Sequence, residues 1–182
     1  MELIKVTMAN LLFARVLQNA IFPPDEDAWA NYLEAVKGIS GNEYWILKED
    51  GGPVGVSGIY VIDAEPKCAW LGWFGILPEH RRKGLGSKAI ALFEEQARKR
   101  GFTTVRLYTA RDDNDAAKTF YRRNGYSEEE YGCPYDAGAL HEPLSIFSKN
   151  LDGSAPVPWG DKFLGIDEQL EKQRKAFTMS NK

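Results

Sequence analysis

Hydrophobic and polar residues follow two different periods along the first part of the chain. Weak alternation predicts a strand over residues 3–7, and apolar positions at helical spacing predict helices that begin near Asn10 and Asp25. Residues 44–48 and 54–62 have the pattern of strands, and Asp50-Gly51-Gly52 between them predicts a hairpin turn. This part should therefore contain a strand, two helices and a β-hairpin.

An apolar run at residues 69–77 predicts a central strand that is buried on both faces. An amphipathic helix over residues 85–100 and a β-branched strand at 103–109 follow, and such a unit needs a parallel crossover. A helix capped by Asn114 or Asp113, a strand that starts at Tyr126 and a strand over residues 144–149 complete the pattern. We expect a mixed α/β fold (α+β), in which helices flank a mostly antiparallel sheet of six to seven strands with one parallel pair.

The composition changes after Asn150. Glycine, serine and proline at residues 152–158 are typical of a linker, and the narrow apolar stripe of Ile166, Leu170 and Phe177 predicts a helix that docks or frays. We expect residues 1–150 to form one domain and residues 151–182 to form a linker with a docking helix. The chain of 182 residues, 43% of them hydrophobic, suits one domain with a substantial core.

Charge and composition exclude several classes of protein. The net charge of −3 argues against general nucleic-acid binding, which depends on a basic surface. We expect no membrane span, because no apolar run is long enough, and no secretory signal, because the first residues lack its pattern. Two cysteines and two histidines are too few for a disulfide framework or a metal cage. A pairing of Cys68 with Cys133 stays open, but a cytoplasmic protein with reduced thiols is the simpler expectation.

The segment Arg81-Arg82-Lys83-Gly84-Leu85-Gly86 lies between the predicted central strand and the following helix. Such a turn presents unpaired N–H groups at the positive end of the helix dipole, here beside three cations. The glycines let the backbone come close to a ligand. The segment therefore predicts a site for a small anion such as a phosphate, with a solvated run of surface cations as the alternative.

Two other phosphate-binding motifs fit this segment less well. A Walker-type loop fails, because Gly86-Ser87-Lys88 has the wrong order. The residues from Gly84 to Ala89 match the dinucleotide-binding fingerprint, but six residues separate them from the strand end at Leu77. The acidic residue that this fingerprint requires is also poorly placed, since Asp112 lies 28 residues after Gly84. Dinucleotide binding stays open as an alternative.

Two segments carry the motifs of a known family. Residues 73–86 fit a strand followed by Arg/Gln-x-x-Gly-x-Gly/Ala, and residues 114–126 fit Asn-x-x-Ala-x-x-Phe-Tyr-x-x-x-Gly-Phe/Tyr. With these motifs the chain resembles the GNAT superfamily of acyl-CoA-dependent N-acetyltransferases, well over residues 54–126 and loosely in the N-terminal helices. The resemblance implies transfer of an acetyl group from acetyl-CoA to a primary amine of a small molecule or peptide.

The resemblance also implies which residues hold coenzyme A. The pyrophosphate would lie on the loop that begins at Arg81, and the pantetheine arm would pair with the central strand near Ile76, where the parallel pair splays and Gly75 allows a close approach. Asn114 either contacts the cofactor or caps its helix, and Lys118 either reaches a phosphate or points to solvent. The expected cofactor-binding residues are Gly75, Ile76, Leu77, Arg81, Arg82, Lys83, Gly84, Leu85, Gly86, Ser87, Asn114 and Lys118.

Acetyl transfer requires a neutral amine, a hydrogen-bond donor for the oxyanion and a proton donor for the departing thiolate. A backbone N–H near Ile76 is the candidate oxyanion donor. Tyr121 occupies the general-acid position of the family, and the resemblance favours that role over simple packing in the core. No general base is assigned, because the central strand carries no acid and none of Asp63, Glu65 and Asp112 stands out.

The sequence indicates the amine acceptor only weakly. Three tryptophans, Trp45, Trp70 and Trp73, either line a pocket or belong to the core. The run Glu128-Glu129-Glu130, expected in the long connection between the last two strands, either attracts a cationic acceptor or is a solvated charge run. A non-catalytic acyl-CoA-binding module stays open as an alternative function, and a homodimer stays open as an assembly.

Overall fold

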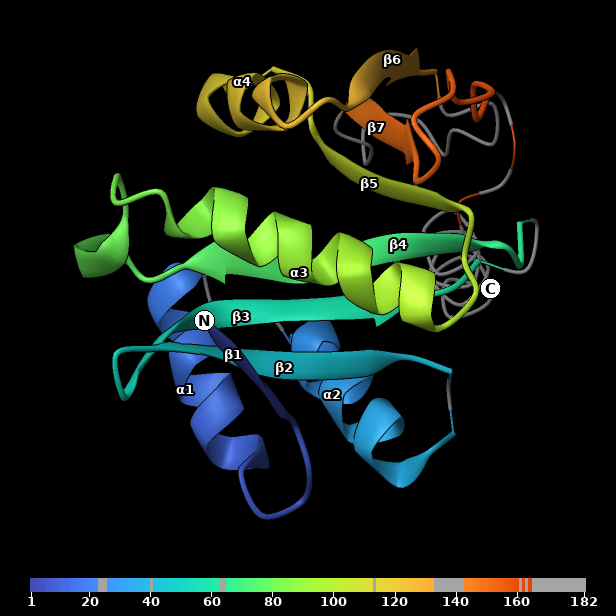
Figure 1. Ribbon diagram of the computed structural model, residues 1–182. Helices are drawn as coiled ribbons and strands as arrows, with labels where there is room; N and C mark the ends of the chain where they lie inside the picture. Colours follow the sequence, from blue (N-terminus) through green and yellow to red (C-terminus); the bar gives the residue numbers. More distant parts are fainter. Residues whose placement is uncertain are drawn as a thin grey trace, which may run out of the picture.

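A twisted β-sheet with helices on both faces forms the framework of the computed structural model (Figure 1). The structure describes residues 1–22, 26–39, 41–62, 65–112, 114–132, 143–160, 162 and 164. Within these residues, seven strands form one sheet in the order β1-β2-β3-β4-β5-β7-β6. Neighbouring strands are antiparallel except for β4 and β5, which are parallel. The predicted fold class is confirmed.

The described elements follow the predicted order. The first half contains β1 (Glu2–Lys5), α1 (Leu11–Ile21), α2 (Glu26–Lys37), β2 (Glu43–Glu49) and β3 (Gly52–Tyr60). The second half contains β4 (Cys68–Ile76), a short 3-10 helix (Pro78–His80), α3 (Leu85–Lys99), β5 (Thr104–Ala110), α4 (Asp115–Arg123), β6 (Ser127–Tyr131) and β7 (Leu144–Asn150). The strand–helix–strand unit of β4, α3 and β5 is the parallel crossover that the sequence predicts.

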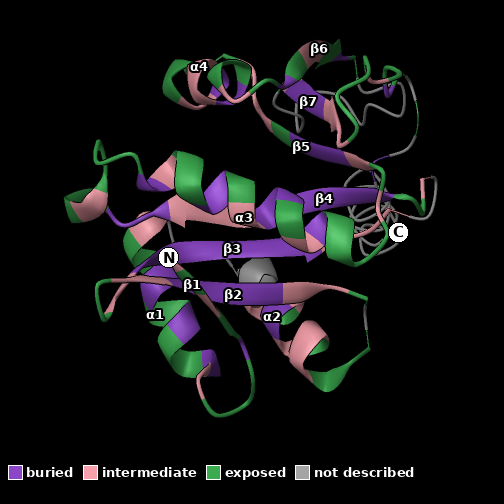
Figure 2. Cartoon of the chain, viewed as in Figure 1, coloured by how far each residue is buried: buried purple, intermediate pink, exposed green. Residues whose placement is uncertain are grey.

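Each face of the sheet is covered by one pair of helices. Buried residues of α1 and α2 pack with Ile46 and Val56, whereas those of α3 and α4 pack with Ile59 and Leu71 on the opposite face. Figure 2 shows the result: the sheet is mostly buried, while exposed residues lie on the outer sides of the helices. None of the helices in the described parts of the chain is long and apolar enough to span a bilayer.

Glycine fixes the end of helix α4 and thereby the position of Tyr121. Gly125 has a φ of 84°, its N–H bonds to the carbonyl of Arg122, and the N–H of Tyr126 bonds to the carbonyl of Tyr121. Glycine adopts positive φ without steric strain, so it closes the helix with this pair of bonds. The turn brings the ring of Tyr126 edge-on to the ring of Tyr121, at 6.0 Å between centroids. Helix α3 ends in the same way at Gly101.

The run Glu128-Glu129-Glu130 lies in strand β6, so its expected place in the connection before the last strand is wrong. Strand β6 is at the edge of the sheet, where charged side chains are tolerated and discourage pairing with other molecules. Glu128 accepts a 2.6 Å hydrogen bond from Arg122, and Glu129 accepts one of 2.6 Å from the backbone N–H of Trp159. These carboxylates are therefore engaged within the protein.

Residues 151–160, which the sequence analysis expects to be a linker, pack on the sheet at Trp159. This side chain is only 1% exposed and meets Trp70 edge-on at a centroid distance of 5.0 Å. Its indole N–H donates a 2.8 Å hydrogen bond to the carbonyl of Lys162. The segment thus adds to the core on the β6–β7 side. The expected helix at residues 166–177 lies outside the described residues, as does Cys133.

Candidate active site

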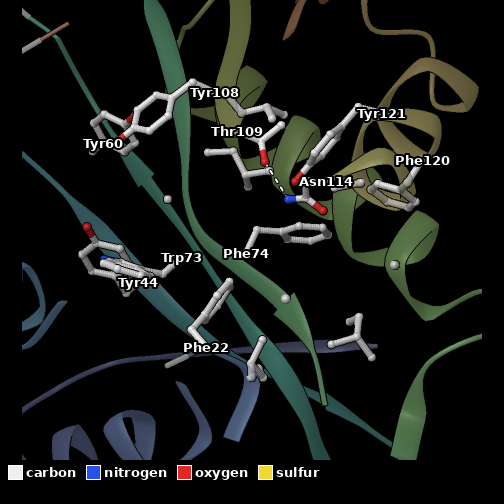
Figure 3. A pocket seen from close by; sticks show the side chains of 18 of the residues that line it. Phe22, Tyr44, Tyr60, Trp73, Phe74, Tyr108, Thr109, Asn114, Phe120 and Tyr121 are labelled. Atoms are coloured by element: carbon white, nitrogen blue, oxygen red, sulfur yellow. Dashed lines mark hydrogen bonds between the residues drawn. The ribbon is translucent and has the colours of Figure 1, made fainter. Parts of the chain in front are cut away.

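Strands β4 and β5 pair only briefly and then separate. The paired residues run from Cys68, opposite Thr104, to Trp70, opposite Arg106. Beyond this point a cavity of about 800 Å³ is lined by residues 71–76 of β4, residues 107–109 of β5 and one side of α4 (Figure 3). The splayed parallel pair that the family resemblance implies is therefore present.

The cavity connects the two faces of the sheet through this gap. Phe74 and Tyr121 belong to the core that α3 and α4 cover, whereas Tyr44 and Trp73 belong to the core that α1 and α2 cover. All four side chains line the same cavity. Two substrates that enter from opposite faces would therefore meet between β4 and β5.

A bulge in β4 shapes the middle of the cavity. Gly72 pairs with Gly58 and Gly75 pairs with Val56, so two residues of β4 stand opposite one residue of β3. Trp73, in the bulge, has a φ of 45°, which is strained for a residue other than glycine. Bulges re-aim side chains and occur often beside active sites. Here the two bulged residues both line the cavity.

Beyond the bulge, the backbone of Ile76 faces the gap. The N–H of Leu77 donates a 2.9 Å hydrogen bond to the carbonyl of Val54 in β3. Because successive backbone groups of a strand point to opposite edges, those of Ile76 point to the side from which β5 has departed. The carbonyl of Ile76 accepts a 2.9 Å hydrogen bond from Nε of Arg81. The N–H of Ile76, the expected oxyanion donor, thus lies on the cavity edge.

The loop before α3 uses its two glycines for different reasons. Gly84 is the N-cap residue with a φ of 77°, and the space around its missing Cβ is open. Gly86 lets α3 approach α4, since a Cβ there would lie 3.1 Å from the ring of Phe120. Leu85 between them is buried and anchors the helix in the core. The loop therefore leaves its backbone accessible at Gly84 while its neighbours hold the helix in place.

The cations of this loop have different surroundings. Arg81 lines the cavity, as does Gly86 at the start of α3. Lys83 donates a 3.0 Å hydrogen bond to the carbonyl of Glu79, and together with Arg82 and Ser87 it is exposed outside the described lining.

The expected cofactor-binding residues at the end of β4 also differ in whether they line the cavity. Leu77 is buried in the core and is not among the residues that line the cavity. Gly75 lines the cavity, but a Cβ at this residue would collide with Ile21 and lie 3.2 Å from Cζ of Phe22. On this face the end of α1 occupies the space, so packing requires glycine at this position; close approach of a cofactor to the backbone edge of Gly75 stays a prediction.

Asn114 and Tyr121 converge on the cavity from α4. Asn114 is the N-cap residue of α4, but its side-chain amide donates a 2.7 Å hydrogen bond to Oγ1 of Thr109 and makes no capping bond, so the alternative of side-chain capping is wrong. Tyr121 is 8% exposed, and its hydroxyl points toward Asn114 and Thr109 (Figure 3). Burial raises the pKa of Tyr121 above its ordinary value, which keeps the phenol protonated at neutral pH.

Lys118 does not point to solvent. Its ammonium group is bonded to the carbonyl of Arg111 and lies 2.8 Å from the carboxylate of Asp115. The side chain lies outside the described cavity lining. Lys118 therefore ties the start of α4 to the end of β5, and both alternatives of the sequence analysis, solvent exposure and a free reach to a phosphate, disagree with these contacts.

Sequence comparison decides the family of the chain. The family model described as "Acetyltransferase (GNAT) family" matches residues 12–126, which include the bulged strand, the glycine loop and α4. The chain belongs to the GNAT acetyltransferases. No curated protein sequence matches it.

Solved GNAT structures share this fold. A Desulfovibrio desulfuricans protein assigned to the GNAT family is 19% identical with a TM-score of 0.67, and the match covers 82% of this chain and 98% of that one. The ribosomal-protein-S18-alanine N-acetyltransferase of Escherichia coli is 20% identical with a TM-score of 0.63, over 87% and 98% of the two chains. A spermidine/spermine N-acetyltransferase of Vibrio cholerae is 16% identical with a TM-score of 0.64, over 83% and 95%.

Two of the carboxylates considered as a general base, Glu65 and Asp112, are not among the residues that line the cavity. Glu65 pairs with Arg106 at 2.8 Å; burial alone would raise the pKa of Glu65, but Arg106 and Lys162 together lower it. Asp112 is exposed beside Arg111, and Asp63 lies outside the described residues. Among the described residues that line the cavity there is no carboxylate, and the described part of the chain contains no cluster of metal-binding side chains.

Aromatic residues that the sequence analysis did not select form the wall on the α1–α2 side. Of the three tryptophans considered there, Trp73 lines the cavity, whereas Trp45 and Trp70 are buried in the core. Additional lining residues are Phe22, Asn31, Asn42, Tyr44, Tyr60 and Tyr108. The two tyrosines Tyr44 and Tyr60 reach this wall because of the pairing register of the strands, which places Tyr44 opposite Gly58 and Tyr60 opposite Trp70. This register cannot be read from composition or spacing.

Proposed function

We propose that this GNAT protein transfers the acetyl group of acetyl-CoA to a primary amine of a small molecule or peptide. The proposal depends on one observation: a single cavity joins the free edge of β4, Arg81 and Tyr121. Family membership supports an acyl-CoA thioester as the donor. The cavity's opening toward the other face of the sheet supports a separate entry for the acceptor.

The residues of the loop and of β4 fit coenzyme A. A diphosphate is complementary to the N–H groups at the start of α3, where Gly84 leaves the backbone open and Arg81 adds positive charge. The amides of a pantetheine arm are complementary to the backbone edge at Ile76, as in addition of a peptide strand. The bound thioester would supply an electrophilic carbonyl.

Two groups of the chain would then act on the reacting atoms. The N–H of Ile76 would donate to the oxygen that gains negative charge as the amine attacks. The neutral Tyr121 hydroxyl would donate its proton to sulfur while the carbon–sulfur bond breaks and the carbon–nitrogen bond forms. The nitrogen releases one proton to solvent as the carbon–nitrogen bond forms. The phenolate takes up one proton from solvent, so the phenol is restored. The acceptor must therefore be neutral when it attacks.

Calorimetry and a thiol-release assay test this function together. We expect acetyl-CoA and CoA to bind in isothermal titration, NAD not to bind, and free thiol to appear when acetyl-CoA is mixed with a panel of primary amines. Binding of NAD without binding of CoA would contradict the proposal.

A second function is favoured by one feature of the site. Because no described lining residue is a carboxylate, a non-catalytic acyl-CoA-binding module fits the same cavity. The two functions differ in the assay: CoA binding without thiol release from any amine would support the module.

A further inference from the structure

Five aromatic rings, from four strands and from the residue that follows α1, surround the end of the cavity on the α1–α2 side. We call them the aromatic slot: Phe22, Tyr44, Tyr60, Trp73 and Tyr108. In Figure 3 these rings gather on one side of the view, and Asn114, Phe120 and Tyr121 lie on the other. The slot is thus separate from the group that would protonate the thiolate, yet both belong to one cavity.

Gly72 is the floor of the slot. A Cβ at this residue would lie 3.1 Å from Cδ1 of Tyr60 and 3.4 Å from Cε1 of Tyr44, so the two rings flank the bare backbone of β4. The ring of Tyr44 also lies directly on Gly58, the pairing partner of Gly72. The rings of Tyr44 and Tyr60 therefore lie against glycine backbone, where a larger side chain would displace them.

Trp73 forms the wall next to the reacting centre. Its positive φ belongs to the bulge, and Phe22 packs edge-on against it at 5.6 Å between centroids. This contact holds the indole in place from the end of α1. Because Ile76 is three residues further along the same strand, a molecule in the slot lies beside the backbone edge proposed to hold the thioester.

The slot is built from neutral groups. Burial raises the pKa of Tyr44 and of Tyr60, and the neighbouring Tyr108 phenol raises both further; the carboxylate of Glu34 on α2, outside the described lining, also raises the pKa of Tyr44. The phenols therefore stay protonated, and the two side-chain amides on this wall, Asn31 and Asn42, are neutral as well. A flat ring can stack here, whereas a ligand with several positive charges would lose water without gaining an anionic partner from the described lining.

We propose that the acceptor is a monoamine carried on an aromatic ring, an arylalkylamine, with its ring in the aromatic slot and its nitrogen directed to the gap between β4 and β5. This inference depends on the proposed acetyl transfer. The nitrogen then lies in the gap, away from bulk water, and this desolvation disfavours its charged form. The slot thereby favours the neutral nucleophile at a site whose described lining offers no carboxylate base.

A matched set of amines tests the slot. We compare kcat/KM by thiol release for 2-phenylethylamine, its saturated analogue 2-cyclohexylethylamine, and spermidine. Stacking predicts a preference of about two- to tenfold for the aromatic amine over the saturated one. Equal or better turnover of 2-cyclohexylethylamine or spermidine would overturn the proposal.

Variants of the slot make the test specific. Tyr60→Leu should remove the preference for the aromatic ring, whereas Tyr60→Phe should keep it, because the ring remains. Gly72→Ala is a second probe, since its added methyl group presses on both tyrosine rings and should raise KM for 2-phenylethylamine. The exposed Leu12→Ala on α1 is the control, with kinetics like those of the wild type. Retention of the ring preference in Tyr60→Leu, or an unchanged KM for 2-phenylethylamine in Gly72→Ala, would contradict the slot.

Titration of the amines into the CoA-saturated protein separates failure of the slot from failure of acetyl transfer. Binding of 2-phenylethylamine that weakens in Tyr60→Leu, without thiol release, would retain the slot and reject the transfer reaction. Thiol release from spermidine but not from 2-phenylethylamine would retain acetyl transfer and reject the slot. An absence of both binding and turnover for 2-phenylethylamine would reject the slot.

Discussion

Nε of Arg81 donates a 2.9 Å hydrogen bond to the carbonyl oxygen of Ile76. This bond ties the start of the glycine loop to the last residue of the bulged strand, so the proposed diphosphate site and the proposed oxyanion donor are held in a fixed relation. Arg81 also lines the cavity, and its guanidinium has further N–H donors for a ligand. One side chain therefore connects the two parts of the proposed thioester site.

Replacement of Arg81 should weaken binding of CoA. Arg81→Ala removes a cation from the loop and the bond to Ile76, and we expect an affinity about tenfold lower by isothermal titration, in keeping with the loss of one charge-assisted contact. Lys99→Ala, which removes an exposed cation from the last turn of α3, is the control. Equal CoA affinity in Arg81→Ala and the wild type would remove Arg81 from the site.

Tyr121→Phe tests the proposed acid. The ring contacts with Phe147 and Tyr126 remain in this variant, so the fold and the CoA affinity should change little. Without the hydroxyl, kcat should fall by about 10²-fold, the lower end for general acid catalysis. Steady-state kinetics and calorimetry measure the two quantities separately. A variant with unchanged kcat would show that Tyr121 only packs in the core.

The buried tyrosines predict loss of stability in alkaline solution. Burial raises the pKa of Tyr32, Tyr121 and Tyr126 in the folded protein, whereas an unfolded tyrosine titrates near pH 10, roughly the model-peptide value. Above that pH the unfolded chain binds fewer protons than the folded one, so the free energy of unfolding falls as pH rises. Denaturant titrations from pH 8 to pH 11 should show this decline.

Tyr32→Phe is the matched variant for this decline. The hydroxyl of Tyr32 is buried and has no hydrogen-bond partner among the described residues, so its removal leaves no broken contact. The variant should lose stability less steeply with pH than the wild type does. A slope identical to that of the wild type would assign the alkaline loss to other groups.

Trp159 should contribute strongly to stability. Trp159→Ala would leave a cavity beside Trp70 and should lower the free energy of unfolding by about 3–5 kcal/mol. Val157→Ala, two residues earlier and 69% exposed, should change it by less than about 0.5 kcal/mol. Chemical denaturation measures both. A Trp159→Ala protein as stable as Val157→Ala would show that this segment adds nothing to the fold.

Local sequence patterns were sufficient to predict most of the fold. The helical spacing of α3, the β-branched residues of β5 and the glycines that end α3 and α4 act over a few residues, so their effects are visible in the sequence. The run Glu128-Glu129-Glu130 was predicted to lie in a connection, because consecutive charged residues are typical of loops. Its place at the edge of the sheet, where charge is acceptable, is set by pairing with β7.

The candidate site likewise combines residues that the sequence reveals with residues that it does not. Gly84 and Tyr121 lie in motifs that one sequence reveals. The bulge at Trp73 and the rings of Tyr44 and Tyr60 depend on which residues of β2, β3 and β4 face one another. A shift of one residue in that register would turn each side chain to the other face, so the acceptor side could not be predicted from the sequence.

Titration of CoA into the wild type and into Gly84→Glu tests the central claim most directly. The claim is that the backbone at Gly84 binds the diphosphate of a nucleotide thioester; a glutamate there brings bulk, negative charge and a residue poorly suited to a φ of 77°. Gly84→Asn, which tolerates this φ and adds no charge, is the control for backbone strain. We predict binding of CoA to the wild type, weaker binding to Gly84→Asn and none to Gly84→Glu. Unchanged affinity in a folded Gly84→Glu protein would contradict the account.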